Sequence, residues 1–451
     1  MRNAASRLNK NGKLEFGYDL AAGEITRVSG GRLVYQDNRA ATGMKTVGHF
    51  RFWDGRQWSI YKENWLQKLI ARVFEEDVRR EQARKEIIRH LMIHLGVEHD
   101  QFDANAHLLF LQDCVLAPVT LVVRPHEPAD CNTFVIPIRY DPQATCPKWR
   151  QCLSDWIGRY DVNGQWVADG ETIQVLQEYT GYCLQVSCKL DKFLLLKGYG
   201  SNGKSVFIQT VADMLDLLAV AFSFSDFGAR FAVGELEGKL LAYTPDETGT
   251  MSNRIDSSVK SFASGETLRS EQKFVQPHNF RNTAKGLWAC NNAPRFADYS
   301  HGNERRVMVV PFNRNFDRES ADLKLDRDQL LQALRAEHSG ILNWAVEGLC
   351  LLLGQGKFTT TEMVRTATAE LLEHHDPLRE FLNEQCAIDR AAETEFAAVY
   401  RRYILWCDER GVERRERVGA RKFSEEICKR QPSVTKKRVG AGVLLQGIRL
   451  V

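Results

Sequence analysis

The spacing of hydrophobic positions divides the chain into regions with different expected folds. From Phe193 onward, short apolar runs alternate with amphipathic segments and polar loops. The first run, Phe193–Leu196, is followed by a glycine-rich loop and by Ser205–Leu215, whose pattern predicts a helix. Further short apolar strands are expected at Leu240–Tyr243, Gly286–Cys290 and Val307–Val310. Strands that alternate with helices predict an α/β domain with a buried sheet.

The N-terminal segments have other periodicities. Phe50–Trp58 predicts a hairpin with Asp54-Gly55 at its turn. Residues 64–95 predict a helix, because apolar residues recur on one face: Trp65, Leu66, Leu69, Ile70, Val73, Phe74, Ile87, Ile88, Leu91 and Met92. A β-rich stretch follows, and then two helical stretches near 147–158 and 171–186. We therefore expect an α+β region before the α/β domain.

The C-terminal part predicts helices and then a final hairpin. Residues 323–390 have a mostly helical pattern, and two more helices are expected over Phe396–Arg410 and Lys422–Lys429. Gly440–Val451 predicts the hairpin. Helices followed by a β-hairpin suit a winged-helix module, and a few other small α+β folds fit as well.

Composition narrows the class of protein. The chain has 451 residues, of which 43% are apolar and 26% charged, so two to four globular domains are expected. This balance excludes a mainly disordered chain, a collagen-like chain and a coiled-coil rod. The apolar runs are too short to span a membrane, and the first residues lack a secretory signal. The 11 cysteines include no Cys-x-x-Cys spacing, which favours a reduced, cytoplasmic protein, in a bacterial host cell if a phage or plasmid encodes it.

Charge is concentrated at the C-terminal end. Residues 401–451 contain 14 Arg or Lys and 6 Asp or Glu, a net charge of +8, whereas the whole chain carries +3. A basic terminal module on a mildly acidic body is typical of a module that meets a polyanion. The alternative is an ordinary solvated surface. The cations form one group of candidates: Arg414, Arg415, Arg417, Arg421, Lys422, Lys429, Arg430, Lys436, Lys437 and Arg438.

The glycine-rich loop after the first strand matches a phosphate-binding motif in full. Residues 198–205, Gly-Tyr-Gly-Ser-Asn-Gly-Lys-Ser, fit G-x-x-x-x-G-K-[ST] between a predicted strand and a predicted helix. In this motif backbone N–H groups cradle phosphate, the lysine reaches the β- and γ-phosphates, and the serine binds Mg²⁺. We therefore predict ATP binding by Gly198, Gly200, Ser201, Asn202, Gly203, Lys204 and Ser205.

Two acidic residues follow the next predicted strand. Asp246 and Glu247 begin 41 residues after Ser205. Asp246 is expected to hold Mg²⁺ together with Ser205, and Glu247 to polarise the attacking water as general base. The alternative is a solvated acidic turn.

Polar residues also border the last two predicted strands. Asn291 follows Gly286–Cys290 and is placed to hydrogen-bond the γ-phosphate or the water. Arg305 and Arg306 precede Val307–Val310, 14 residues after Asn291. Taken alone, such an arginine pair is usually a surface pair.

The order and compactness of these motifs resemble superfamily 3 helicases, which are AAA+ ATPases. Specifically, the chain resembles the phage/plasmid and poxvirus-type primase–helicase family. The segments Trp53-Asp-Gly-Arg-Gln-Trp58 and Leu176–Leu184 are similar to the part of the family before the ATPase core, and Glu337–Gly348 to its helical lid. Tyr400-x-x-Tyr-x-x-Trp406 resembles the family's C-terminal winged-helix domain, which binds DNA.

The resemblance implies a role for each motif. Lys204 and Ser205 match the Walker A pair, Glu247 the more constant Walker B acid, and Asn291 the sensor 1 residue. The arginine pair matches the position of the finger that enters a neighbouring subunit's site, without indicating which of the two acts. Thr267–Phe280 corresponds to a hairpin that grips DNA in the central channel, and its candidates are Lys273, Arg269 and His278. Exposed hairpin charges are the alternative for those three.

The expected architecture is an AAA+ type P-loop core between two other regions. We predict a collar-like α+β region over 1–180, the ATPase core with its lid over 181–355, and a helical linker with a basic winged-helix-like DNA-binding domain over 356–451. Many family members carry an N-terminal primase domain, for which the first 50 residues are too short, so we expect either a stand-alone helicase or a piece of a longer polypeptide. The resemblance implies a homo-hexameric ring with ATP and Mg²⁺. It also implies single-stranded and forked DNA as partners, with a separate primase or polymerase as a further candidate partner, but no membrane.

The function expected from these patterns is an ATP-dependent DNA helicase in the replication of a phage, plasmid or other mobile element. The family translocates 3′ to 5′ on DNA, and this polarity comes from the resemblance alone. One alternative is an ATP-dependent origin-binding or loading protein without processive unwinding. Another is an RNA helicase or a packaging motor, because ATPase motifs do not specify the type of nucleic acid.

Overall fold

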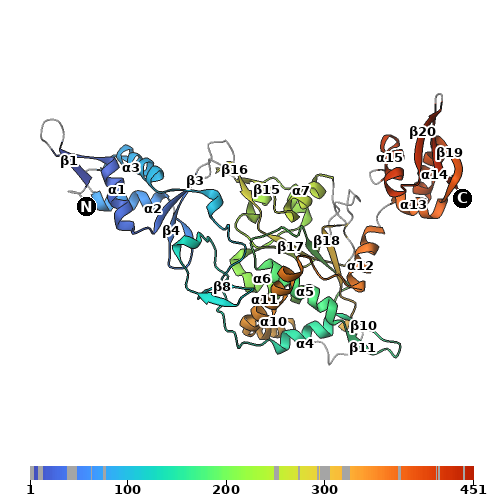
Figure 1. Ribbon diagram of the computed structural model, residues 1–451, viewed down its shortest axis with the longest axis horizontal. Helices are drawn as coiled ribbons and strands as arrows, with labels where there is room; N and C mark the ends of the chain where they lie inside the picture. The colour runs from blue at the N-terminus through green and yellow to red at the C-terminus, as the bar shows by residue number, and fades with distance from the viewer. Residues whose placement is uncertain are drawn as a thin grey trace.

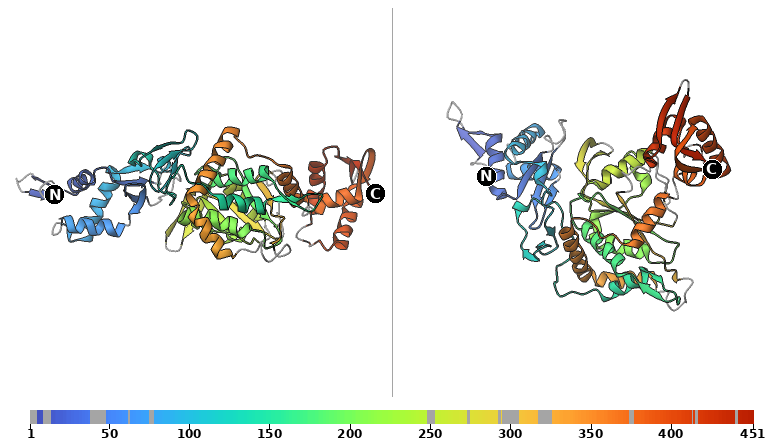
Figure 2. Two further views of the ribbon diagram at one scale, coloured as in Figure 1. Left: turned by 90° about the horizontal axis from the view of Figure 1, so that it is seen from below. Right: turned by 45° about the vertical axis from the view of Figure 1, so that its right-hand side comes forward.

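The computed structural model describes most of the chain. The described residues are 5–8, 14–37, 48–61, 63–74, 78–247, 253–272, 275–291, 294, 305–316, 326–373, 377–412, 414, 417–439 and 442–451. Figures 1 and 2 show an N-terminal region, a central α/β domain and a C-terminal domain at the far end of the molecule.

The N-terminal region is a sheet covered by helices. Its strand order is β5-β4-β3-β6, made of β3 (Leu33–Asp37), β4 (His49–Trp53), β5 (Trp58–Tyr61) and β6 (Gly96–Glu98). Three helices, α1 (Tyr18–Ser29), α2 (Glu63–Phe74) and α3 (Glu81–His94), share one buried core with it. A small hairpin of β1 (Ser6–Leu8) and β2 (Leu14–Phe16) precedes α1.

The predicted hairpin is confirmed, but the single long helix is wrong. Trp53 pairs with Trp58 across the β4–β5 turn. The residues expected in one helix belong to α2 and α3 instead. Within α2 the buried stripe is Leu66, Ile70 and Phe74, spaced by four residues, whereas Trp65 is 59% exposed because it lies beside that stripe.

The next segment joins the core of the central domain. It contains a sheet of β7 (Leu109–Phe110), β8 (Val115–Ala117) and β9 (Val122–Arg124), followed by α4 (Pro147–Trp156), the hairpin of β10 (Gly158–Tyr160) and β11 (Trp166–Ala168), and α5 (Gly170–Cys183). The Glu337 carboxylate accepts hydrogen bonds from Lys148 N and Trp149 N, both 3.0 Å, and so caps α4 from a distant part of the chain.

The central domain is built on a five-stranded parallel sheet. The order is β13-β14-β17-β12-β18, from β13 (Ala219–Ala221), β14 (Leu241–Thr244), β17 (Lys285–Cys290), β12 (Phe193–Lys197) and β18 (Val307–Pro311). This confirms the four predicted strands and the α/β class. Because all strands are parallel, the loops after them meet at one edge of the sheet.

Helices cover both faces of this sheet, which explains the uninterrupted apolar runs. In β12, Leu194 and Leu196 face the cluster that holds α5, α6 (Lys204–Leu215), α10 (Arg327–Ala336) and α11 (His338–Gln355). Phe193 and Leu195 face the opposite cluster, with α7 (Asn253–Ala263) and α12 (Glu362–Glu373). A hairpin of β15 (Thr267–Gln272) and β16 (Val275–Arg281) follows α7.

The C-terminal domain has its own core. It combines α13 (Pro377–Gln385), α14 (Phe396–Glu409) and α15 (Ala420–Arg430) with a three-stranded antiparallel sheet of order β19-β21-β20. The predicted helical stretch to residue 390 is wrong at its end, because β19 (Cys386–Glu395) begins there. The final hairpin starts earlier than predicted, with β20 (Thr435–Val439) paired to β21 (Gly442–Leu450).

Among the described residues, no helix is both long and apolar enough to cross a membrane. The domain boundaries at residues 180 and 355 stay predictions, although the apolar cluster that includes α4 and α5 also contains strand β12.

Candidate nucleotide-binding site

The glycine-rich loop lies at the carboxyl edge of the sheet, between β12 and α6. Gly203 has φ +91°, and a Cβ there would lie 2.4 Å from the Trp156 ring. Gly198 is required for a different reason, since its Cβ would lie 2.2 Å from Asn202 Nδ2 and 2.4 Å from Phe312 O. The loop thus needs glycine for both backbone conformation and close approach, and it leads into a helix N-terminus, where anions are favoured.

Lys204 extends back over the loop and is buried. Its Nζ donates to Gly198 O at 2.7 Å, to Asn202 Oδ1 at 3.0 Å and to Asn291 Oδ1 at 3.3 Å. Burial lowers the pKa of Lys204, and the nearby Cys290 and Asp246 oppose that shift. Asn291 directly follows β17, which neighbours β12, so the structure brings it to the loop as the sequence predicted.

The two acidic residues reach the same edge but meet different surroundings. Asp246 is exposed, whereas Glu247 is 3% exposed. Glu247 N donates to Ala289 O at 2.6 Å, and the Glu247 carboxylate accepts a hydrogen bond from Phe224 N at 2.9 Å. Asp246 therefore fits a group that meets a hydrated cation, while Glu247 is held by the backbone at the start of the 3₁₀ turn Phe224–Gly228.

The residues present fit a magnesium ion held jointly with a nucleotide. Ser205 is the second residue of α6, and its side chain is only partly buried. Within the described ranges, no group of three or more His, Cys, Asp or Glu residues is arranged to hold a metal ion. Mg²⁺ usually takes one or two protein ligands and fills its shell with phosphate oxygens and water, so one hydroxyl and one carboxylate suffice.

The arginine pair lies at the opposite edge of the sheet from the loop. Val307 pairs with Phe193 at the start of β12, and six residues separate Arg306 from Phe312. At the rise of a parallel strand this is about 20 Å, too far for either side chain to reach its own loop. Arg306 is buried and donates to Ser264 Oγ at 2.9 Å, whereas Arg305 is 64% exposed beside Asp191, 3.5 Å away.

The hairpin after α7 is present, but its charged residues are partly engaged. Lys273 lies outside the described residues. Arg269 Nε is 3.4 Å from the Glu271 carboxylate, and His278 Nε2 is 2.8 Å from Glu237 Oε2 with its side chain 14% exposed. Of these two, only Arg269 keeps most of its side chain accessible to a ligand.

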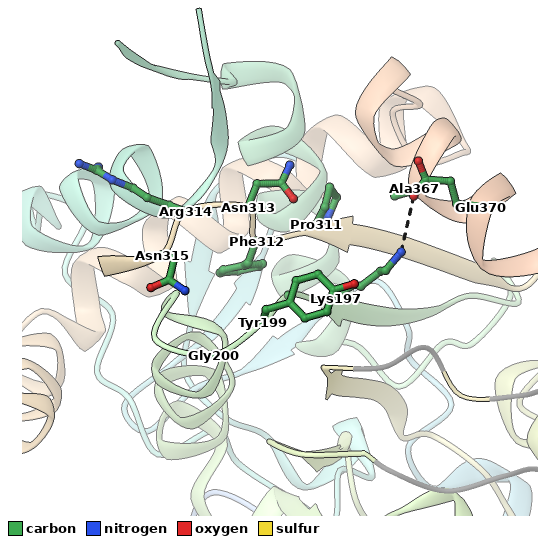
Figure 3. A pocket seen from close by; sticks show the side chains of 11 residues that line it. Lys197, Tyr199, Gly200, Pro311, Phe312, Asn313, Arg314, Asn315, Ala367 and Glu370 are labelled. Atoms are coloured by element: carbon green, nitrogen blue, oxygen red, sulfur yellow. Dashed lines mark ion pairs between the residues drawn. The ribbon is translucent and has the colours of Figure 1, made fainter. Parts of the chain in front are cut away.

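A cavity of about 390 Å³ adjoins the loop (Figure 3). Its lining comes from the loop, from the segment after β18 and from α12, and Lys197 forms an ion pair with Glu370 across it at 3.5 Å. Tyr199 and Asn313 also line it, while Arg314 points away toward Asp155, 3.2 Å from it.

Sequence reasoning missed the segment 311–316 and Trp156. One signal for the segment was available, because residues that follow β18 must emerge beside the loop that follows the adjacent parallel strand β12. Trp156 gave no such signal, since its contact with Gly203 joins segments that are distant in the chain.

Comparisons with known proteins agree with this arrangement. Residues 32–158 match the family model described as D5 N terminal like, and residues 196–306 match a family of unknown function, DUF5906. The putative helicase L207/L206 of Acanthamoeba polyphaga mimivirus is 26% identical over 185 residues, covering 38% of this chain and 19% of that protein. The chain therefore spans about a fifth of the length of that relative.

The fold has a counterpart among solved structures. The A form apo structure of the NrS-1 C terminal region superposes with a TM-score of 0.51 at 10% identity, covering 95% of this chain and 99% of that one. At this identity the likeness shows the fold alone. Together, the matches show a shared fold and a partial likeness to a putative helicase.

The buried Glu247 carboxylate generates a prediction about stability. We expect Glu247→Ala to lower the free energy of unfolding by about 1–3 kcal/mol, because it leaves the buried Phe224 N–H unpaired. Glu247→Gln keeps an oxygen acceptor and should cost much less. Urea unfolding followed by tryptophan fluorescence measures this, since the Trp288 ring lies 4.7 Å from that of Phe224. Asp246→Ala, at the exposed neighbour, is the control, and equal losses in Asp246→Ala and Glu247→Ala would contradict the assignment.

Proposed function

We propose that this chain is an ATP-dependent DNA helicase of the superfamily 3, AAA+ type, active in the replication of a phage, plasmid or other mobile element. The observation that carries the proposal is the meeting of Lys204, Asn291 and the two acids at one sheet edge. The helicase-like relative and the D5 N terminal like segment support it independently.

ATP would lie with its phosphates on the loop and its nucleoside toward the adjoining cavity. The backbone N–H groups of 198–205 and the start of α6 favour an anion, and Lys204 supplies the cation. Ser205 and Asp246 would hold Mg²⁺, which offsets phosphate charge when bound. Lys197, Tyr199, Asn313 and Glu370 line the space available to the ribose and base.

Hydrolysis requires a base and a group that orients the attacking water. Glu247 would accept the proton of the water, exchanging its hydrogen bond from Phe224 N for one from that water. The Asn291 amide lies beside Lys204 and would orient the γ-phosphate or the water. The charge that develops on the transferred phosphoryl group also needs a further cation, and the two others beside the loop are already paired, Lys197 with Glu370 and Arg314 with Asp155.

We propose that Arg305 supplies this cation to the next subunit. It is exposed, it lies at the sheet edge opposite its own loop, and its pairing with Asp191 is a weak surface contact. Arg306 is held by Ser264 and would keep the strand end in place. A finger that acts in trans requires a head-to-tail interface, which closes into a ring when the rotation allows, and we propose a hexamer.

DNA would pass through this ring and be gripped by the β15–β16 hairpin. Lys273 and Arg269 are the hairpin cations that fit sequence-independent, salt-sensitive contact with phosphates. ATP turnover would move the hairpin along the strand, with the 3′ to 5′ polarity that the family resemblance implies.

The C-terminal domain would bind DNA with only part of its basic group. Arg417 pairs with Asp408, Lys429 and Arg430 with Glu426, and Lys437 with Glu393, so these cations are already partly neutralised. Arg415 lies outside the described residues. Within the basic group, five exposed cations form no ion pair with any described residue and would meet the phosphates: Arg414 before α15, Arg421 and Lys422 on α15, and Lys436 and Arg438 on β20.

The first prediction concerns activity. Lys204→Ala should abolish ATP hydrolysis stimulated by single-stranded DNA and unwinding of a forked duplex, because the phosphates lose their cation. Steady-state ATPase and strand-displacement assays measure this, and Lys189→Ala, an exposed lysine before β12, is the control. Full activity of Lys204→Ala would refute the proposal. Wild-type protein that binds duplex and hydrolyses ATP without unwinding would favour a loading protein, and stimulation by RNA alone would exclude a DNA helicase.

The second prediction concerns the shared site. Arg305→Ala and Lys204→Ala should each be inactive alone, yet mixing them should restore part of the ATPase, because some interfaces then combine an intact loop with an intact Arg305. Light scattering with a non-hydrolysable ATP analogue and forked DNA checks for six-subunit rings. Arg306→Ala is the comparison. Recovery with Arg306→Ala but not with Arg305→Ala would assign the finger to Arg306, and no recovery in either mixture would count against a trans finger.

The third prediction compares the cations on the two faces of strand β20. Lys436→Ala combined with Arg438→Ala should weaken duplex binding. The slope of log affinity against log salt concentration should also become shallower, by about one for each phosphate that the protein no longer neutralises. Lys437→Ala, between them on the opposite face and paired with Glu393, should change little. Fluorescence anisotropy at several salt concentrations tests this, and equal effects of both variants would refute the assignment.

A further inference from the structure

The asparagine inside the glycine-rich loop has a buried side chain that contacts two other parts of the site. Asn202 is 3% exposed, and its Nδ2 donates to Phe312 O at 3.1 Å, in the segment after β18. Its Oδ1 accepts from Lys204 Nζ at 3.0 Å. The amide therefore connects the loop, the neighbouring strand's exit and the lysine, although the motif itself leaves position 202 unspecified.

Chemistry fixes which way this amide faces. If its oxygen and nitrogen exchanged places, an NH₂ group would face the Lys204 ammonium and a carbonyl oxygen would face Phe312 O. Both contacts would then be repulsive, in a buried place where polar groups need partners. Only an asparagine in this orientation satisfies both neighbours.

The surrounding backbone is built closely around this side chain. A Cβ on Gly198 would lie 2.2 Å from Asn202 Nδ2, so the glycine leaves the space that the amide occupies. Phe312 N donates to Lys197 O at 2.7 Å, and Phe316 N donates to Ser201 O at 3.0 Å. The Asn202 side chain adds a third contact between the loop and the segment after β18, because its Nδ2 donates to Phe312 O.

The hydrogen bonds of the lysine go to neutral oxygens. An ammonium has three N–H donors, and those of Lys204 are taken by Gly198 O, Asn202 Oδ1 and Asn291 Oδ1. Hydrogen bonds to neutral acceptors are weaker than those to ionised ones, so a phosphate can displace them, whereas a carboxylate at 202 would compete with it. The position thus favours an amide over an acid.

We propose that Asn202 is a positioning residue for ATP hydrolysis. Its amide fixes the phosphate loop to the segment that follows β18, and it holds Lys204 Nζ where the ammonium can move onto the phosphates of bound ATP. The proposal rests on the function proposed above. Asn202 acts through its contacts with Lys204 and Phe312.

Two variants of Asn202 separate its two contacts. Asn202→Ala removes both, and we expect kcat to fall about 10- to 100-fold with KM changed less than about threefold, because the loop is displaced during turnover. Asn202→Asp keeps an oxygen for Lys204 but places another against Phe312 O, and its charge competes with phosphate, so KM should rise about tenfold or more. Steady-state ATPase on the full chain measures both constants.

A second readout needs neither ATP nor turnover. Hydrogen–deuterium exchange of the backbone amides of 198–205, followed by mass spectrometry, reports how firmly the loop is held. Exchange should become faster in Asn202→Ala and in Asn202→Asp, because both lose the hydrogen bond that Nδ2 donates to Phe312 O. Failure of ATP hydrolysis in the wild type would overturn the helicase proposal, yet this faster exchange would still be observed if Asn202 holds the loop.

A matched control distinguishes positioning from general stability. Asn282 is also buried, and its amide donates to Phe262 O and Ala284 O at the other edge of the sheet. Asn282→Ala should lower stability without a split between kcat and KM and without faster exchange confined to 198–205. Unchanged exchange of 198–205 in both Asn202 variants, or the same kinetic change in Asn282→Ala, would overturn the proposal.

Discussion

One buried ammonium connects the segments on which the candidate site depends. Lys204 bonds to the start of its own loop, to the loop's asparagine and to the residue after β17. Removing this charge from water is costly, and the three oxygens that offset the cost come from backbone and side chains that must all be in place. The burial and the hydrogen bonding of Lys204 therefore depend on the positions of all three segments at this edge of the sheet.

The segment before the sheet contributes to the same constraint. Trp156 ends α4 and packs where any side chain on Gly203 would lie, and α4 is in turn capped by Glu337, between α10 and α11. The match to a D5 N terminal like family ends at residue 158, just beyond this tryptophan. That segment thus contributes Trp156 to the packing of the glycine-rich loop.

Local pattern was enough to predict the strands and the loop, but not the contacts between distant segments. The four apolar runs were buried on both faces and so had one interpretation, and the parallel order of the strands then placed Asn291 beside Lys204. The helix over 64–95 was wrong because a shared periodicity did not reveal the break between α2 and α3. The partners of His278 and Arg306, Glu237 and Ser264, lie about 40 residues away in the chain, and no spacing rule indicates them.

Strand β18 has a consequence for how variants are interpreted. Its carboxyl end holds the phosphate loop of its own chain through Phe312, while its amino end carries the arginine assigned to a neighbouring chain. If Arg305 acts as proposed, a substitution within Val307–Pro311 would therefore disturb two nucleotide sites, one in each of two adjacent subunits. In a closed ring, every site would then receive the defect twice, so the measured loss of activity would exceed the damage at any single contact.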